Sequence, residues 1–278
     1  MGTAQAELNL QSHGFAVAGY MVMATNPTDI AVPFPEADLL RLRVLVGPCR
    51  VRIRPGAGDA WAKGRYDDPT GLLPMNVTAD SGQLTLSQST TVAAPSRLTR
   101  APLLDLEIGT ARPYELSIQG GANETVVDLG GLPLTRLTLR HGAGKSDVDF
   151  SAPNPELMSS LDVAAGGVAM YLRNLGNANF AEMVVSGGAA QYRLDFEGQL
   201  RRPAQVRLNT GVAAIELRLP SATPARLRSQ SVLGAMDVGD GFVTREGAYW
   251  NEAALAGREP SLQITVSSVF GSVKVRSS

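Results

Sequence analysis

The stretch LTLRHGAGKSDVDF, residues 137–150, carries the pattern that decides the fold. An apolar-x-apolar run is followed by a glycine, Gly144, and then by a second apolar-x-apolar run that begins four residues after that glycine. Between Gly120 and Gly234 the glycines recur about every 22 to 24 residues, and a period of this size is typical of stacked repeats. Further copies lie at 42–53, 161–172, 183–194 and 206–217, and looser ones at 116–129 and 264–275.

The apolar spacing of two and the punctuation by Gly, Pro, Asn and Asp predict an all-β protein. Two strands of about five residues per copy cannot bury their apolar faces alone. Stacking the copies at about 4.8 Å buries them, which predicts a parallel β-solenoid, and the general handedness of parallel crossovers predicts a right-handed one. An antiparallel sandwich is the alternative; it explains the alternation but not the period.

The pattern divides the chain into three parts. Residues 1–35 are irregular and rich in proline, so we expect an N-terminal cap or an added strand. Residues 36–111 form less regular first coils. Residues 112–278 form the regular solenoid, in which 240–260 interrupts the period and is expected to be a loop over the end of the stack.

Composition narrows the function classes. The chain has 278 residues, of which 44% are hydrophobic, so a continuous core is expected. Lys and Arg number 25 against 26 Asp and Glu, and this balance predicts no attraction to nucleic acid. The single cysteine, Cys49, has no disulfide partner within the chain and is expected in the core.

The sequence also bears on location. Arg41 is the first Lys or Arg, so the positive region of a secretory signal is missing, and no apolar run is long enough to cross a bilayer directly. We therefore expect a cytoplasmic protein, or an envelope-associated one if a leader or membrane segment has been removed.

Several segments resemble those of bacterial toast-rack domains. Residues 241–251 (GFVTREGAYWN), 259–266 (EPSLQITV) and 271–275 (GSVKV) are similar to the C-terminal end of that family. Residues 127–134 (VDLGGLPL) and 142–149 (GAGKSDVD) resemble its middle coils. The resemblance covers roughly residues 36–278. It implies a β-helical scaffold related to adhesin-like and cell-wall-active antibiotic response proteins, without established catalysis.

The solenoid pattern predicts an outward column of side chains along the second strand of each copy. In this column Asp128 would lie directly over Asp149, with Asp147 nearby. Such carboxylates form a solvated mixed-charge face, hold a hard cation, or act as the acid and nucleophile of a glycoside-cleaving enzyme. The column would continue through Tyr171, Arg193 and Glu216, and include Arg52, Asp237 and Lys274.

Other motifs are incomplete. GAGKS at 142–146 resembles the tail of a P-loop and part of a calcium nonapeptide, but the first glycine and the tandem repeat are missing, so we expect no cofactor. A Ser146, His141 and Asp147 set lacks a nucleophile elbow. We expect His141 to lie at a turn in solvent, and His13 is the only other histidine.

Four aromatic residues are expected to be partly exposed: Trp61, Tyr66, Tyr249 and Trp250. Exposed aromatic rings stack on sugars or anchor protein partners. Packing in the core or cap is the default expectation for these rings, and Trp61, Tyr249 and Trp250 are the candidate ligand-binding residues.

Three functions remain open. The leading hypothesis is a non-enzymatic scaffold or protein-interaction module, linked to envelope stress or adhesion, that binds a protein partner or itself through a solenoid face or end. The second is a carbohydrate or cell-envelope ligand binder. The third is a polysaccharide-active β-helix enzyme that uses Asp128, Asp147 and Asp149.

Overall fold

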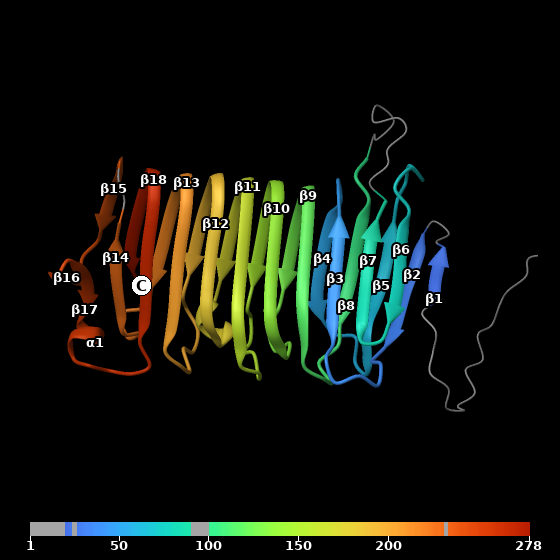
Figure 1. Cartoon of the computed structure of the whole chain (residues 1–278), viewed down its shortest axis with the longest axis horizontal. Coiled ribbons are helices and arrows are strands. Elements are labelled where there is room, and N and C mark those ends of the chain that lie inside the picture. The colour runs from blue at the N-terminus through green and yellow to red at the C-terminus, as the bar shows by residue number, and fades with distance from the viewer. Residues whose placement is uncertain (1–19, 24–26, 90–99, 231–232) are drawn as a thin grey trace, which may run out of the picture.

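The computed structural model describes residues 20–23, 27–89, 100–230 and 233–278. It is an elongated stack of β-strands with two walls that enclose one core (Figure 1). Two short helices lie within these residues, η2 (Leu175–Ala178) and α1 (Glu252–Leu255). Neither helix in the described part of the chain has the length or apolar character needed to cross a membrane.

Five long strands make up the regular middle of the stack, and they pair in parallel with their neighbours. Each coil is one strand of 15 or 16 residues that bends at the glycines, rather than two short strands joined by a turn. The first half of each strand lies on the first wall and the second half on the second wall. These strands are β9 (Tyr114–Asp128), β10 (Leu134–Asp149), β11 (Met158–Arg173), β12 (Phe180–Asp195) and β13 (Ala204–Leu219).

This arrangement confirms the parallel β-solenoid and rules out an antiparallel sandwich for the middle of the chain. The right hand of the coil stays a prediction.

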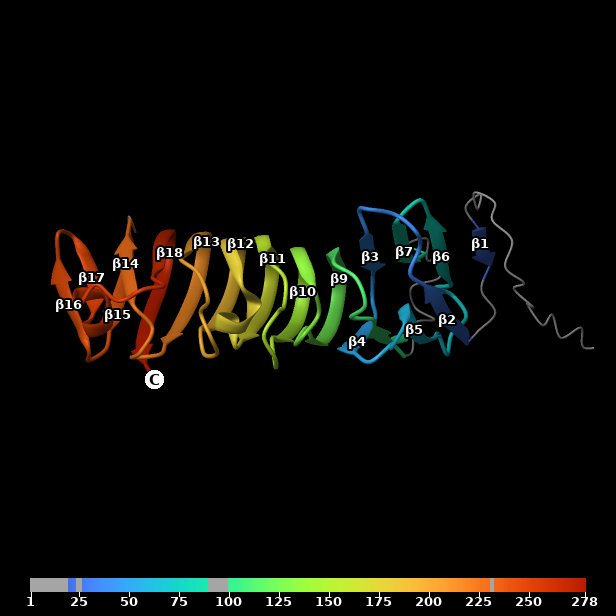
Figure 2. The same ribbon diagram turned by 90° about the horizontal axis from the view of Figure 1, so that it is seen from below.

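At the N-terminal end the order in space differs from the order in the chain. Strands β3 (Arg41–Val46) and β4 (Arg50–Pro55) lie on opposite walls (Figure 2). Both pair with β9 on one side, and on the other side they pair with β7 (Gln83–Gln88) and β8 (Leu103–Ile108) respectively. The first coil in sequence is therefore the second from this end.

Antiparallel strands close the N-terminal end. Strand β5 (Ala60–Asp67) pairs with β8 and with β2 (Thr28–Pro33). Strand β6 (Met75–Asp80) pairs with β7 and with β1 (Tyr20–Met23).

The C-terminal end shows the same inversion. The last strand, β18 (Leu262–Ser277), pairs with β13 on one side and with β14 (Ala225–Ser229) and β15 (Leu233–Val238) on the other. Residues 240–260, predicted as a loop, contain α1 and a hairpin of β16 (Phe242–Arg245) and β17 (Ala248–Asn251), and β17 pairs with β14. This hairpin covers the end of the stack (Figure 1).

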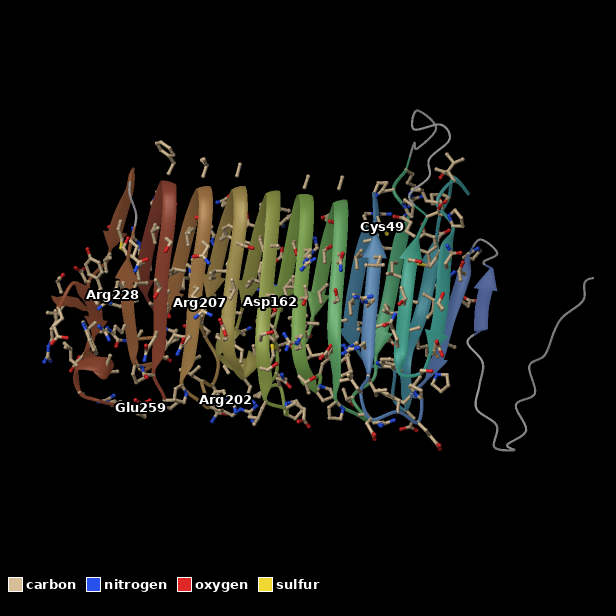
Figure 3. The ribbon with its side chains drawn as sticks, viewed as in Figure 1. Cys49, Asp162, Arg202, Arg207, Arg228 and Glu259 are labelled. Carbon is tan, nitrogen blue, oxygen red and sulfur yellow. The ribbon has the colours of Figure 1, made fainter. Side chains whose placement is uncertain are left out.

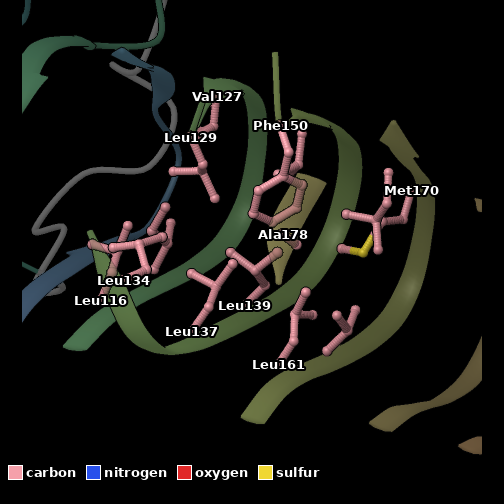
Figure 4. Close-up of a cluster of buried hydrophobic side chains, with 14 of the residues drawn as sticks. Leu116, Val127, Leu129, Leu134, Leu137, Leu139, Phe150, Leu161, Met170 and Ala178 are labelled. Atoms are coloured by element: carbon pink, nitrogen blue, oxygen red, sulfur yellow. The ribbon is translucent and has the colours of Figure 1, made fainter. Parts of the chain in front are cut away.

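Rows of apolar side chains fill the core between the walls (Figure 4). Each row takes one residue from each coil, and its members are at most 2% exposed. On the first wall a row contains Leu116, Leu137, Leu161, Met183, Val206 and Ile264; on the second wall another contains Val127, Val148, Leu172, Leu194, Leu217 and Val275.

One predicted inner row is wrong by two residues. In the repeats, the second apolar run begins at Val148, Met170, Tyr192 and Ile215, which predicts one inner row of these four residues. In the structure the residue opposite Met170 is Ser146. Ser146 is fully buried although it is polar, so its strand does not read as an apolar-x-apolar run at this point.

At the edge of the stack opposite the glycine corner, side-chain amides link the connections between successive coils. Asn154 is fully buried in the connection after β10, and its Oδ1 accepts hydrogen bonds from the backbone N–H groups of Leu134 (3.2 Å) and Glu156 (2.9 Å). Its Nδ2 donates to the carbonyls of Leu134 (2.9 Å) and Ala178 (3.1 Å). One amide thus joins three consecutive coils, and it satisfies backbone groups that no ladder reaches.

The corner glycines are not equivalent, which gives a matched test. Gly144 has φ +112°, and an added Cβ would lie 2.0 Å from the carbonyl oxygen of Asn123, whereas a Cβ on Gly188 would meet nothing within 4 Å. We expect Gly144→Ala to lower the free energy of unfolding by at least about 2 kcal/mol. We expect Gly188→Ala to leave it unchanged or raise it by up to about 1 kcal/mol. Chemical denaturation followed by circular dichroism measures both, and equal effects would contradict this account of the corner.

Candidate functional site

The predicted pair of acidic residues is adjacent in the structure. Asp128 lies directly opposite Asp149 in the parallel register of β9 and β10, at the end of both strands on the second wall. Asp128 accepts hydrogen bonds from the Ser151 hydroxyl (2.7 and 2.8 Å to its two oxygens) and from the Gly130 N–H (2.9 Å). Both oxygens of Asp128 therefore accept hydrogen bonds from residues just beyond the ends of β9 and β10.

The other two carboxylates are also partnered. Asp149 accepts from Asn174 Nδ2 at 2.7 Å and lies 3.5 Å from Arg173 Nε. Asp147 pairs with Arg173 (2.9 Å) and with Lys145 (3.3 Å). These contacts form a mixed-charge surface in which each carboxylate has a donor.

The outward column needs a correction. Tyr171 lies opposite Asp147, not Asp149, and Asp149 instead lies opposite Arg173. The prediction was wrong because Ser146, a polar residue, occupies the buried position opposite Met170. Tyr171, Arg193 and Glu216 align as predicted. Their column also contains Arg52, Lys274 and Asp237, as predicted, but Val126 and Asp147 take the places expected for Asp128 and Asp149.

Metal binding at Asp128 and Asp149 stays a prediction. Among the described residues no three His, Cys, Asp or Glu side chains gather closely enough to hold a metal ion. Cys49 is buried as expected, at the corner between β3 and β4 (Figure 3), and burial raises the pKa of its thiol to about 12.

Two of the four aromatic residues expected at the surface are buried. Trp61 is 1% exposed, stacks on Phe34 with ring centroids 5.9 Å apart, and meets Tyr114 edge-on at 6.4 Å. Tyr66 is also 1% exposed, and its hydroxyl donates to the Leu73 carbonyl. The exposure predicted for both residues is wrong, because the antiparallel strands at the N-terminal end cover the core there.

Tyr249 and Trp250 lie on β17 at the other end and are half-buried. The Arg226 guanidinium stacks on the Trp250 ring at 4.6 Å, and Trp250 Nε1 donates to the Arg245 carbonyl at 3.1 Å. Ligand binding by these two residues stays a prediction.

His141 is not a turn residue in solvent. It lies within β10 and is only 3% exposed, and its Nδ1 lies 3.2 Å from Asn123 Oδ1. Because a carbonyl oxygen accepts, Nδ1 carries the proton, and Nε2 has no partner among the described residues. Ser146 is also buried, whereas Asp147 lies on the outer surface, so the three do not form a catalytic set. His13 lies outside the described residues.

The sequence reading missed a group of arginines on the first wall. Arg41 and Arg43 on β3, and Arg136 and Arg140 on β10, line a hollow of about 250 Å³. Glu115, on the strand between them, is the one carboxylate in its lining. We call this hollow the arginine trough. The two arginines of β3 are about 95 residues from the two of β10 in sequence, so only the register of β3, β9 and β10 brings the pairs together.

Comparison with known proteins agrees with the fold. Residues 24–166, just over half of the chain, match the family described as the N-terminal domain of toast_rack, DUF2154. The chain belongs to this toast-rack family. No curated protein sequence matches the toast-rack chain.

Three solved bacterial proteins are similar to the toast-rack chain. A putative cell adhesion protein from Clostridium sporogenes is 15% identical with a TM-score of 0.43, and the match covers 94% of this chain and 99% of that one. A putative adhesin from Bacteroides fragilis is 9% identical with a TM-score of 0.38, covering 93% and 96%. A putative adhesin from Parabacteroides merdae is 8% identical with a TM-score of 0.34, with the same coverage.

Burial of His141 predicts a pH dependence of stability. Burial lowers its pKa from 6.5 to about 4, so the unfolded chain binds the proton more tightly than the folded chain. The contribution of His141 to the free energy of unfolding is constant above pH 6.5, and this free energy falls as the pH drops from 6.5 towards 4. Between pH 7 and pH 4 we expect the wild type to lose about 3 kcal/mol more than His141→Gln. Denaturant unfolding at both pH values measures this difference, and identical losses would show that His141 is not buried in its neutral form.

Proposed function

We propose that this toast-rack chain is a non-enzymatic interaction module that pairs with an extended segment of another polypeptide along β16. The observation that carries the proposal is the edge of that strand. Within the described residues β16 pairs only with β17, so its other edge carries backbone donors and acceptors that face outward. An open edge of this kind is a template for strand addition.

The hairpin fixes which groups face outward. Arg245 and Ala248 flank the two-residue turn of Glu246 and Gly247, and both turn residues have positive φ (51° and 69°), as type I′ turns require. The flanking pair is hydrogen-bonded in such hairpins, so the next pair, which includes Thr244, is not. The N–H and C=O of Thr244 therefore point away from β17.

An exposed apolar side chain accompanies this edge. Val243 on β16 is 56% exposed, which is unusual for a large hydrophobic residue. A paired segment would cover this side chain while its backbone completes the ladder. A second copy of the chain offers the same edge, so self-association is the simplest case.

A proline at the outward position tests the proposal. We expect wild type to form dimers or larger species as concentration rises in size-exclusion chromatography with light scattering. Thr244→Pro should reduce the association at least tenfold, because proline removes the outward N–H without touching the β16–β17 ladder. Thr244→Val keeps the N–H and the strand propensity, so it should associate like the wild type.

If the partner is a different protein, the wild type, Thr244→Pro and Thr244→Val can each be used as bait in a pull-down. The wild type and Thr244→Val should retain the partner, and Thr244→Pro should lose it. A wild type that stays monomeric and retains no partner would overturn the proposal. Equal behaviour of the proline and valine variants would show that association does not use the β16 edge.

A further inference from the structure

The arginine trough has a floor and two sides. Strand β9 forms the floor, and β3 and β10 flank it, as their order in Figure 1 shows. Ser117 lies opposite Arg43 on β3, and Gln119 lies opposite Arg140 on β10. Since neighbouring strands are about 4.8 Å apart, the two flanking strands are about 10 Å apart. Short polar side chains thus separate two strands that carry long cationic ones.

The charges in the trough are unbalanced. Glu115 accepts from Arg41 Nε at 3.0 Å and lies 3.7 Å from Arg136 Nε, so it serves both arginines of its own row. Arg43 and Arg140 have no ion pair within the described part of the chain. Four guanidinium groups and one carboxylate leave a local charge of +3, although the net charge of the whole chain is −1.

The trough ends at the next strand. Opposite Thr138 of β10 lies Asp162 of β11, whose carboxylate accepts from the Ser160 hydroxyl at 3.0 Å. The positive region is therefore confined to the width of three strands. Guanidinium groups bind carboxylate and phosphate in a bidentate manner, which fits a single oxyanion group between Arg43 and Arg140.

The trough continues into a second hollow at the glycine corner. Gln119 and Arg140 line both hollows, and the second has a volume of about 630 Å³. It exists because glycines stand where neighbouring coils approach: a Cβ on Gly142 would lie 2.9 Å, and one on Gly166 2.5 Å, from a carbonyl oxygen of the preceding coil. Val46 adds an apolar side chain to this lining. Apart from Arg140, which it shares with the trough, the corner hollow thus offers a surface without charged side chains.

We propose that the arginine trough binds the carboxylate or phosphate group of an organic molecule whose uncharged remainder lies in the corner hollow. Arg43 and Arg140 hold the oxyanion, while Glu115 orients Arg41 and Arg136 beside it. This site lies on the first wall, away from the β16 edge, so it is independent of the proposed pairing.

Calorimetric titration of the full chain tests the site with five probes: acetate, hexanoate, inorganic phosphate, hexyl phosphate and hexanol. We expect hexanoate or hexyl phosphate to bind at least tenfold more tightly than the matching short anion, and hexanol not to bind. The two long probes distinguish a carboxylate ligand from a phosphate ester. Raising the salt concentration should weaken the binding.

The variant Arg43→Gln/Arg140→Gln should weaken binding of the long anions at least tenfold. The single variants Arg43→Gln and Arg228→Gln form the matched pair, because each removes one charge and Arg228 lies in the same row of the first wall as Arg43, several coils away (Figure 3). All three residues are exposed, so all of these variants should unfold at the same denaturant concentration as the wild type.

Three results would overturn the proposal. Undetectable binding of every anion at millimolar concentration would remove the site. Equal loss in Arg43→Gln and Arg228→Gln would indicate general electrostatic attraction to the wall. Equal affinity for short and long anions would show that the corner hollow has no part in binding.

Discussion

Parallel pairing in register between successive coils is the constraint on which the rest of this structure depends. No coil can bury its own inner face, so each apolar row is completed only by the coils before and after it. The same pairing satisfies the backbone, and it also places the side chain at any position over its equivalent in the next coil. Leu137, for example, lies between Leu116 and Leu161 in the core. Columns of outward residues are therefore a consequence of the backbone ladder, and their chemistry depends on which residue types the repeats place at one position.

The two ends show how a stack is closed when its edges would otherwise stay open. At each end a coil that is terminal in the sequence lies inside the stack: β3 and β4 lie between β9 and β7/β8, and β18 lies between β13 and β14/β15. The first and last coils in sequence therefore pair with strands on both sides. Short strands and antiparallel pairs occupy the outermost positions of the stack. Short edge strands limit uncontrolled pairing, so the edge that remains at β16 is small and defined.

The two walls and the glycine corner could be predicted from the sequence. The alternation of apolar and polar residues indicates which side chains are buried, and the period of the glycines indicates where backbones approach closely. The prediction failed where a residue departs from its usual environment. Ser146 and Thr125 are polar residues at buried inner positions, so the apolar pattern did not show the true register. The predicted register therefore placed Asp149 beside Tyr171, which lies opposite Asp147. Trp61 was placed at the surface because no local pattern shows that β2 and β5 fold back over the first coils. The order of strands at the ends is a long-range property that no repeat encodes.

The arginine trough was not predicted for a related reason. The net charge of the whole chain does not indicate local charge in a stack, because the register of the strands determines which side chains are neighbours. On the second wall, opposite charges are neighbours in one column: Arg193 lies opposite Glu216 and pairs with it at 2.9 Å. On the first wall, two arginines of β3 and two of β10 flank β9, which contributes a single carboxylate, Glu115, to the trough. Where neighbouring side chains already pair with opposite charges, a bound ion adds little favourable electrostatic energy. Guanidinium groups without a carboxylate partner are stabilised by any oxyanion that fits between them. The two walls share one backbone geometry, so this difference in side-chain charge gives the first wall the stronger potential for anion recognition.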